Sequence, residues 1–186
     1  MNNLAKEIWQ INESKGFHDP KIYDKGKALA LIVSEACECL EAERKQRYAK
    51  LKEFEHALSL GMNEIYDKVF EELIKGSVED EIADVFIRTL DYAVQNGIEV
   101  KYKDNLLRDS ETIPDFIMNV SESVKYLYWQ RNLEKNKKTF DEELTINNIL
   151  EDCFSLAEFL NFDLMKFIVY KIRYNKNRPY LHNKSF

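Results

Sequence analysis

The segment 28–42 most constrains what this chain can fold into. Drawn as a helix at 100° per residue, it is apolar on nearly all sides, because Leu29, Ile32 and Leu40 lie opposite the side that holds Leu31. A helix that is apolar all round is buried among other helices or crosses a membrane. This apolar run is well short of the roughly 20 residues that a membrane span needs. The segment therefore predicts a central helix inside a helical bundle.

Helical spacing and a shortage of helix breakers extend this prediction to the whole chain. The 186 residues include five glycines and three prolines, and 32% of them are charged; this composition favours long helices. No segment shows the alternation of apolar and polar residues that is typical of strands. The predicted helices cover residues 2–13, about 23–55, 63–75, 77–96, about 112–132, 144–160 and 164–175. We expect an all-α helical bundle in which residues 1–186 form a single domain.

Charge, cysteines and hydropathy exclude several classes of protein. The net charge of −6 argues against a general binder of nucleic-acid backbones. Cys37, Cys39 and Cys153 show neither a disulfide framework nor a CxxC metal spacing, so we expect free thiols in a reducing compartment. The N-terminus lacks the apolar core of a signal peptide. The sequence therefore predicts a soluble, cytoplasmic protein that binds neither nucleic acid nor a membrane.

Two pairs of carboxylates, each three residues apart, lie in apolar helical segments: Glu35 with Glu38, and Glu81 with Asp84. Residues at i and i+3 share a helix face, so each pair directs two carboxylates the same way. We expect Glu35 and Glu38 in a buried stripe of small residues, and Glu81 and Asp84 at the edge of an apolar face. Four converging carboxylates suit Mg²⁺. The alternative is solvated or salt-bridged acids, since pairs such as Glu38/Glu41 arise often among 33 acidic residues.

The C-terminal residues 171–184 gather five Lys and Arg side chains beside amide groups. Arg offers forked donors and Lys a compact charge, so such a segment suits polyphosphate. The candidate phosphate-binding residues are Lys171, Asn175, Arg178 and Lys184, and an exposed basic tail is the alternative. An acidic metal site together with a phosphate-binding tail indicates metal-assisted phosphoryl chemistry. The chain has no GxxxxGK[ST] motif, which excludes a P-loop protein.

In this order the motifs resemble those of the MazG-like, all-α nucleoside triphosphate pyrophosphohydrolases. The shared patterns are SExxE from Ser34, ExxD from Glu81 and a closing K-xxx-N-xx-RPY-x-H-x-K from Lys171. The segment 9–17 also resembles the first helix and loop of the family. The resemblance covers about residues 1–100 and the last twenty or so. One departure is Ser34, since the first motif of the family often begins with Glu-Glu.

The resemblance implies hydrolysis of a (deoxy)nucleoside triphosphate to a monophosphate and pyrophosphate, with Mg²⁺ or Mn²⁺ as cofactor. The implied metal ligands are Glu35, Glu38, Glu81 and Asp84, with Glu38 and Glu35 as catalytic residues and Glu38 as the preferred general base. The implied substrate-binding residues are Lys171, Asn175, Arg178, Lys184, Trp9, Asn12 and Phe17. For Trp9, packing in the core is the stronger interpretation.

Family members are usually dimers or tetramers, so the resemblance also implies a homodimer or a higher homo-oligomer. Three alternatives stay open: a related dUTPase-like enzyme, a phosphoribosyl-ATP pyrophosphohydrolase, and a non-catalytic helical regulator or interaction module.

A faint internal repeat relates the two halves of the chain. The segments 117–122 and 154–164 resemble 31–35 and 90–100. The second copy lacks the acidic pairs; Lys125, for example, stands in place of Glu38. One hypothesis is that residues 110–186 are a degenerate second half that replaces a partner subunit and brings the basic tail to the carboxylates of the first half.

Overall fold

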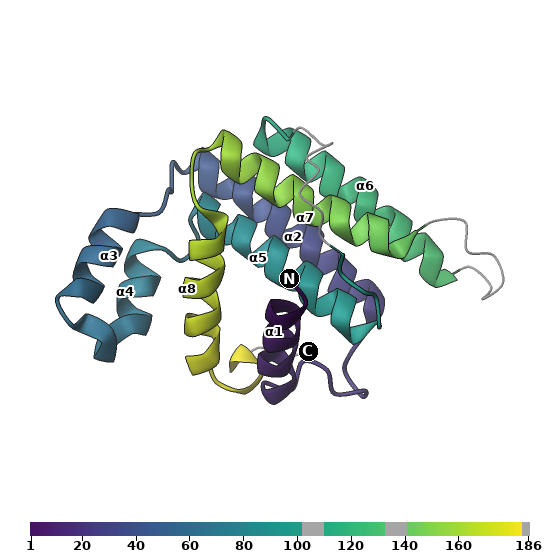
Figure 1. Cartoon of the computed structure of the whole chain (residues 1–186), viewed down its shortest axis with the longest axis horizontal. Coiled ribbons are helices and arrows are strands. Elements are labelled where there is room, and N and C mark those ends of the chain that lie inside the picture. Colours follow the sequence, from purple (N-terminus) through teal and green to yellow (C-terminus); the bar gives the residue numbers. More distant parts are fainter. Residues whose placement is uncertain (102–109, 133–140, 184–186) are drawn as a thin grey trace.

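The computed structural model describes residues 1–101, 110–132 and 141–183. All regular structure in these ranges is helical, which confirms the all-α prediction (Figure 1). The elements are α1 (Asn2–Ser14), α2 (Lys25–Arg44), α3 (Leu51–Ser59), η1 (Met62–Ile65), α4 (Tyr66–Leu73), α5 (Val78–Gln95), α6 (Ile113–Asn132), α7 (Glu142–Phe159), α8 (Leu164–Asn177) and η2 (Tyr180–Asn183). None of the described helices combines the length and the apolar character needed to cross a bilayer.

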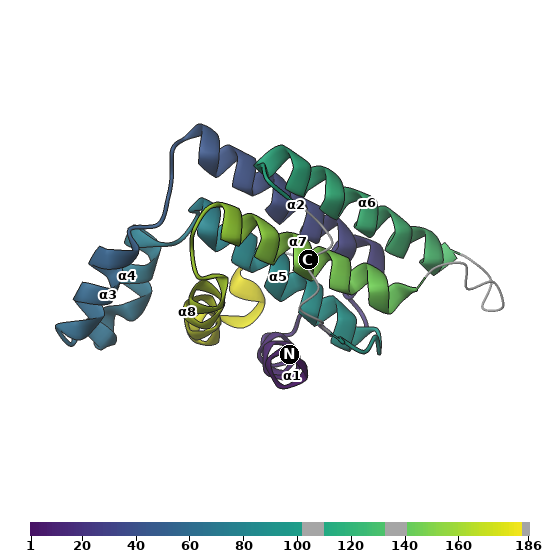
Figure 2. The same ribbon diagram turned by 45° about the horizontal axis from the view of Figure 1, so that its top comes forward.

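Four long helices form the body of the molecule (Figures 1 and 2). Helix α2 packs against α5 and α6, and α7 packs against the same two helices, so the four close a bundle around one apolar core. Helices α1 and α8 also pack against α5. Twelve of the 18 residues of α5 are buried. Helix α5 is thus the central helix, and polar side chains on it can meet partners from α2, α1 and α8.

Both ends of α5, which the sequence places at about 77 and 96, carry local cap signals. Ser77 is the N-cap, and its hydroxyl accepts a hydrogen bond of 3.2 Å from the Asp80 N–H. At the other end Gly97 has a φ of 69°, a left-handed conformation that glycine adopts without strain. These signals fix the start of α5 and place Glu81 and Asp84 in its first two turns.

The single helix predicted over about 23–55 is wrong in its second half. Helix α2 ends at Arg44, and Gln46 then takes a left-handed φ of 52° before α3 begins. The turn is tied to the start of α5, because the Val78 N–H donates a hydrogen bond of 3.1 Å to the Arg47 carbonyl. The break therefore depends on a contact between segments far apart in the sequence, which a local pattern does not reveal.

The hairpin formed by α3 and α4 projects from the bundle and packs against α8 (Figure 1). Aromatic rings fill this contact: Phe54 meets Tyr170 with ring centroids 5.0 Å apart, and Phe70 stacks on Tyr174 at 4.6 Å. The Tyr66 hydroxyl also donates a 2.8 Å hydrogen bond to the Tyr170 carbonyl. The hairpin therefore braces α8, the helix that carries the basic C-terminal motif.

The helix pair α6–α7 lies beside the pair α2–α5 in the arrangement that an internal repeat would require. Helix α6 packs on α2, its predicted counterpart, and α7 packs on α5. The duplication itself stays a prediction.

Candidate metal and substrate site

Three carboxylates converge where α2 packs against the first turns of α5. Glu35 and Glu38 come from α2 and Glu81 from α5, and one oxygen of each lies within 4.8 Å of the others. The i, i+3 spacing places the two α2 carboxylates on one face, and the capped start of α5 sets Glu81 opposite them. Carboxylate oxygens are the ligands that Mg²⁺ prefers in proteins. The donor set thus fits the predicted cation.

The burial of these side chains differs from the predicted asymmetry. Glu35 is buried, as expected, but Glu38 is exposed and Glu81 is only 7% exposed. The expectation that Glu38 lies deep and Glu81 at an open edge is therefore wrong. The physical reason is the packing of α2 on α5, because Glu81 faces α2 and meets Glu35 and Glu38 in that contact.

Several carboxylates share this buried space, which raises the pKa values of Glu81 and Glu35. Burial is the main cause that raises the pKa of Glu81 from its usual 4.5 to about 9, and the neighbouring carboxylates of Asp84, Asp80 and Glu35 add to the shift. Burial also raises the pKa of Glu35, as does Asp84, although the Arg88 guanidinium acts in the opposite direction. At neutral pH, without a cation, Glu81 therefore holds a proton, and a divalent ion would replace it.

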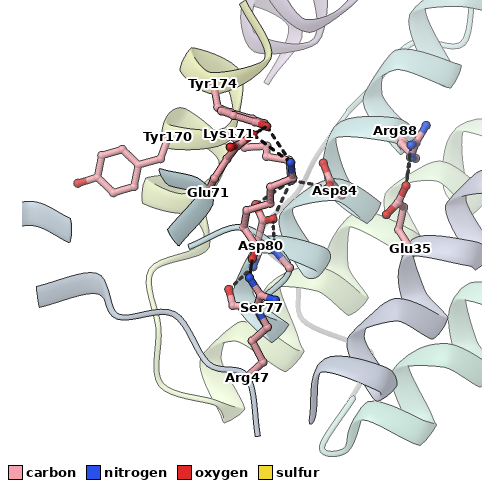
Figure 3. A network of polar contacts seen from close by, with 12 residues as sticks. Glu35, Arg47, Glu71, Ser77, Asp80, Asp84, Arg88, Tyr170, Lys171 and Tyr174 are labelled. Atoms are coloured by element: carbon pink, nitrogen blue, oxygen red, sulfur yellow. Dashed lines mark hydrogen bonds and ion pairs between the residues drawn. The ribbon is translucent and has the colours of Figure 1, made fainter. Parts of the chain in front are cut away.

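Asp84, the fourth predicted ligand, pairs with Lys171 from α8 (Figure 3). The Lys171 ammonium lies 2.7 Å from Asp84 Oδ2 and 2.8 Å from both carboxylate oxygens of Asp80. Asp80 also accepts a 2.8 Å hydrogen bond from the Gly76 N–H. The basic tail thus reaches the carboxylates of the first half within one chain. Since an ammonium has three N–H donors, the phosphate-binding role predicted for Lys171 would require it to leave one of these oxygens.

Arg88, one turn after Asp84 on α5, is a residue that the sequence reasoning missed. Its Nε and Nη2 both lie 2.6 Å from Glu35 Oε1 (Figure 3). The sequence did contain a signal for it: Arg88 follows Asp84 by four residues and Glu81 by seven, and this spacing places all three side chains on one face of the helix. Arg88 links the acidic cluster to the neighbouring pocket.

A pocket with about 120 Å³ of free space opens beside this cluster, with Asp84 and Arg88 in its wall. An ordered water needs about 10–15 Å³ of such space, so the pocket can hold several waters or a group of ring size. Its wall joins both ends of the chain to α5, and includes Asn12, Phe17, His18, Asp91, Asn175 and Arg178. Four of these were predicted to bind substrate: Asn12, Phe17, Asn175 and Arg178.

The first loop and the C-terminal tail meet because Gly16 leaves room for an aromatic ring. Gly16 has a φ of 84°, and a Cβ built on it would lie 2.3 Å from the ring of Tyr180. The Leu181 N–H donates a hydrogen bond of 2.9 Å to the Lys15 carbonyl, and Lys15 Nζ donates one of 2.9 Å to the Lys176 carbonyl. These contacts hold the tail against the loop, so both can contribute side chains to one pocket.

Trp9, a predicted substrate-binding residue, lies outside the pocket wall, as does Lys171. Trp9 donates a 2.7 Å hydrogen bond to Gln95 and stacks on the His18 ring at a centroid distance of 5.2 Å. His18, which does line the pocket, has its Nε2 3.1 Å from the Asp91 carboxylate. The sequence reasoning read the surrounding loop only as a helix break. Lys184 lies outside the described residues.

Asn175 lines the pocket and has a buried amide oxygen. Its side chain is 9% exposed, and its Oδ1 has no hydrogen-bond donor within the described ranges 1–101, 110–132 and 141–183. A buried acceptor without a partner is costly unless a ligand or water satisfies it. The atom has almost no accessible surface, so a ligand in the pocket could reach it only after the side chain rearranges.

No family model, no curated protein and no solved structure matches this chain. The resemblance to the MazG-like enzymes therefore rests on the motifs alone.

Proposed function

We propose that the chain is a metal-dependent nucleoside triphosphate pyrophosphohydrolase, which converts a (deoxy)nucleoside triphosphate to a monophosphate and pyrophosphate. Glu35, Glu38 and Glu81 would hold Mg²⁺, whereas Asp84, the fourth predicted ligand, is paired with Lys171. The main support for the proposal is that the carboxylate cluster and the pocket lie next to each other. The carboxylate cluster adjoins a pocket lined by the residues predicted to bind substrate, and Asp84 and Arg88 stand between the two.

Each set of side chains has a role that follows from its position. A bound Mg²⁺ would neutralise phosphate oxygens and lower the pKa of a coordinated water. Glu38 is the exposed member of the cluster, so it is the carboxylate best placed to accept a proton from water. Arg178 and Arg88 give the pocket positive charge for a polyphosphate. Asn12 and Phe17, from the opposite end of the chain, would contact the base.

A non-catalytic module has support from a different observation. Asp84 and Glu35 are paired with Lys171 and Arg88, as the acids of a purely structural cluster would be. In the described part of the chain, however, neither Glu38 nor Glu81 pairs with a basic side chain. The absence of a basic partner at these two positions leaves their oxygens available to a cation, with the Glu81 proton displaced on binding, and favours the cation-binding proposal. A rise of the melting temperature with Mg²⁺ distinguishes the two, since a structural cluster gives no such rise.

The enzymatic test is release of pyrophosphate from a panel of canonical and modified nucleoside triphosphates, deoxyuridine triphosphate and phosphoribosyl-ATP, with and without Mg²⁺. We expect Glu38→Gln to reduce the rate at least about 100-fold. Loss of a residue that only hydrogen-bonds a metal ligand already reduces metal affinity or activity about 10–100-fold. Glu41→Gln is the matched control: the same substitution one turn further along α2, on an exposed side chain that pairs with Arg44. Equal rates for both variants would refute the site.

We also propose a cytoplasmic location, from the free cysteines and the polar N-terminus, and a homodimer or higher homo-oligomer, from the resemblance. The packing of α6–α7 against α2–α5 can supply within one chain a contact that a partner subunit would otherwise make. Light scattering coupled to size-exclusion chromatography measures the oligomeric state directly.

A further inference from the structure

Lys171 is a buried cation at the edge of the acidic cluster. The residue is 4% exposed, and its three shortest polar contacts are carboxylate oxygens at 2.7–2.8 Å, two from Asp80 and one from Asp84. An ammonium has three N–H donors. All three donors of Lys171 thus have a carboxylate oxygen within hydrogen-bond distance.

The charges around Lys171 explain why a lysine can be buried there. Five carboxylates occupy this end of α2 and α5: Glu35, Glu38, Asp80, Glu81 and Asp84. Two basic groups from neighbouring positions contact them, Lys171 and Arg88. A buried ammonium is stable only where carboxylates compensate it. The protein itself therefore supplies one positive charge to the Asp80–Asp84 side of the cluster, whereas no basic side chain in the described ranges contacts Glu38 or Glu81.

The surroundings hold Lys171 in this place. Its Nζ lies 5.7 Å from the centre of the Phe70 ring. One turn along α8, the Tyr174 hydroxyl donates a hydrogen bond to Glu71 and accepts one of 2.9 Å from Lys75 (Figure 3). These contacts come from α4 and the turn after it, so the hairpin fixes the register of α8.

We propose that Lys171 is a built-in cation that occupies the Asp80–Asp84 position, so that the site takes one divalent ion per chain, held by Glu35, Glu38 and Glu81. Enzymes that act on phosphates with two metal ions hold them about 3.5–4 Å apart between shared carboxylates. Here the ammonium of Lys171 holds the carboxylates of Asp80 and Asp84, which would otherwise be free to bind a second ion. The inference rests on the proposed metal site, and it adds Asp80 as the residue that positions the lysine.

The test is the number of Mn²⁺ ions bound per chain, measured by electron paramagnetic resonance of free Mn²⁺ during titration. We expect one ion for the wild type. Lys171→Met frees Asp80 and Asp84, so we expect two ions. The double variant Asp80→Asn/Lys171→Met removes the carboxylate as well as the lysine, and we expect one ion again. The double variant is the matched control, since it has the same methionine without the additional acidic site.

The outcomes separate this inference from the proposed function. No Mn²⁺ on the wild type would contradict the metal site itself. One ion on the wild type and one on Lys171→Met would overturn the built-in cation and leave the metal site standing, as would two ions on the wild type. Lys171→Met leaves buried carboxylates unpaired and can unfold. In that case we expect Mn²⁺ to restore its helical circular dichroism, and a variant that stays unfolded in Mn²⁺ would overturn the inference.

Discussion

The raised pKa of Glu81 predicts that binding of a divalent ion releases a proton. Burial and the charges of Asp84, Asp80 and Glu35 bring the pKa of Glu81 to about 9 in the folded chain. A carboxyl group with that pKa is ionised in only about 1% of molecules at pH 7. A metal ion binds the carboxylate and not the carboxylic acid, so each binding event must remove the proton.

The size of the effect follows from the same value. Loss of a proton from a group with a pKa of about 9 costs about 1.4 kcal/mol per pH unit, or roughly 2.7 kcal/mol at pH 7. The affinity for Mg²⁺ should therefore rise nearly tenfold per pH unit from pH 6.5 to 8.5 and level off above pH 9. Close to one proton should be released per ion at pH 7.

Isothermal titration calorimetry in two buffers of different ionisation enthalpy measures this proton release. Glu81→Gln is the control: it should bind the ion more weakly, with a flatter dependence on pH and less proton release. An affinity of the wild type that does not change with pH, with no proton released, would refute the electrostatic reasoning.

Three further predictions concern stability and substrate binding. Folding raises the pKa of Glu81 from 4.5 to about 9, so the chain takes up a proton on folding between these pH values. The free energy of unfolding of the metal-free protein should therefore fall as pH rises through this window, by up to about 1.4 kcal/mol per pH unit. Urea unfolding at several pH values should show a smaller change with pH for Glu81→Gln. Ser77→Ala removes the N-cap of α5 and should lower the free energy of unfolding by about 1 kcal/mol in the same assay, whereas an unchanged midpoint would contradict the cap. Arg178→Ala should raise the KM for the nucleotide about 10–100-fold, since a hydrogen bond to a charged group contributes about 1.5–3 kcal/mol; Lys176→Ala, on a side chain that pairs with Glu7 outside the pocket wall, should leave the KM unchanged.

Local signals in the sequence were sufficient for most helix boundaries. Ser77 before an acidic turn and Gly97 after an apolar stretch are caps that act within a few residues, and both ends of α5 lie where they predict. The turn at Gln46 could not be predicted in this way. It follows a charged, helix-favouring run, and it is held by a hydrogen bond from Val78 to Arg47, on segments about thirty residues apart.

The candidate site shows the same division. Spacing predicted that Glu35 and Glu38 share a face, and the structure brings one oxygen of each near Glu81. Helical periodicity identifies which residues lie together, but the neighbouring helix decides which of them are buried. The packing of α2 on α5 buries Glu81 beside Glu35, whereas Glu38 stays exposed in the same contact.

Arg88 and His18 were missed for a related reason. An arginine in an apolar helix and a histidine in a loop have no local pattern that names their partners. Their partners, Glu35 and Asp91, come from other elements. Only the packing of α2 and of the first loop against α5 shows that both side chains belong to the site.

The measurement that tests the central claim most directly is a crystal structure with Mn²⁺ and a nucleoside triphosphate analogue whose α–β bridge resists hydrolysis. The account predicts one anomalous peak at coordination distance from carboxylate oxygens of Glu35, Glu38 and Glu81, with the analogue in the pocket beside Arg178. An analogue bound elsewhere, or a cluster without an anomalous peak at saturating Mn²⁺, would contradict it.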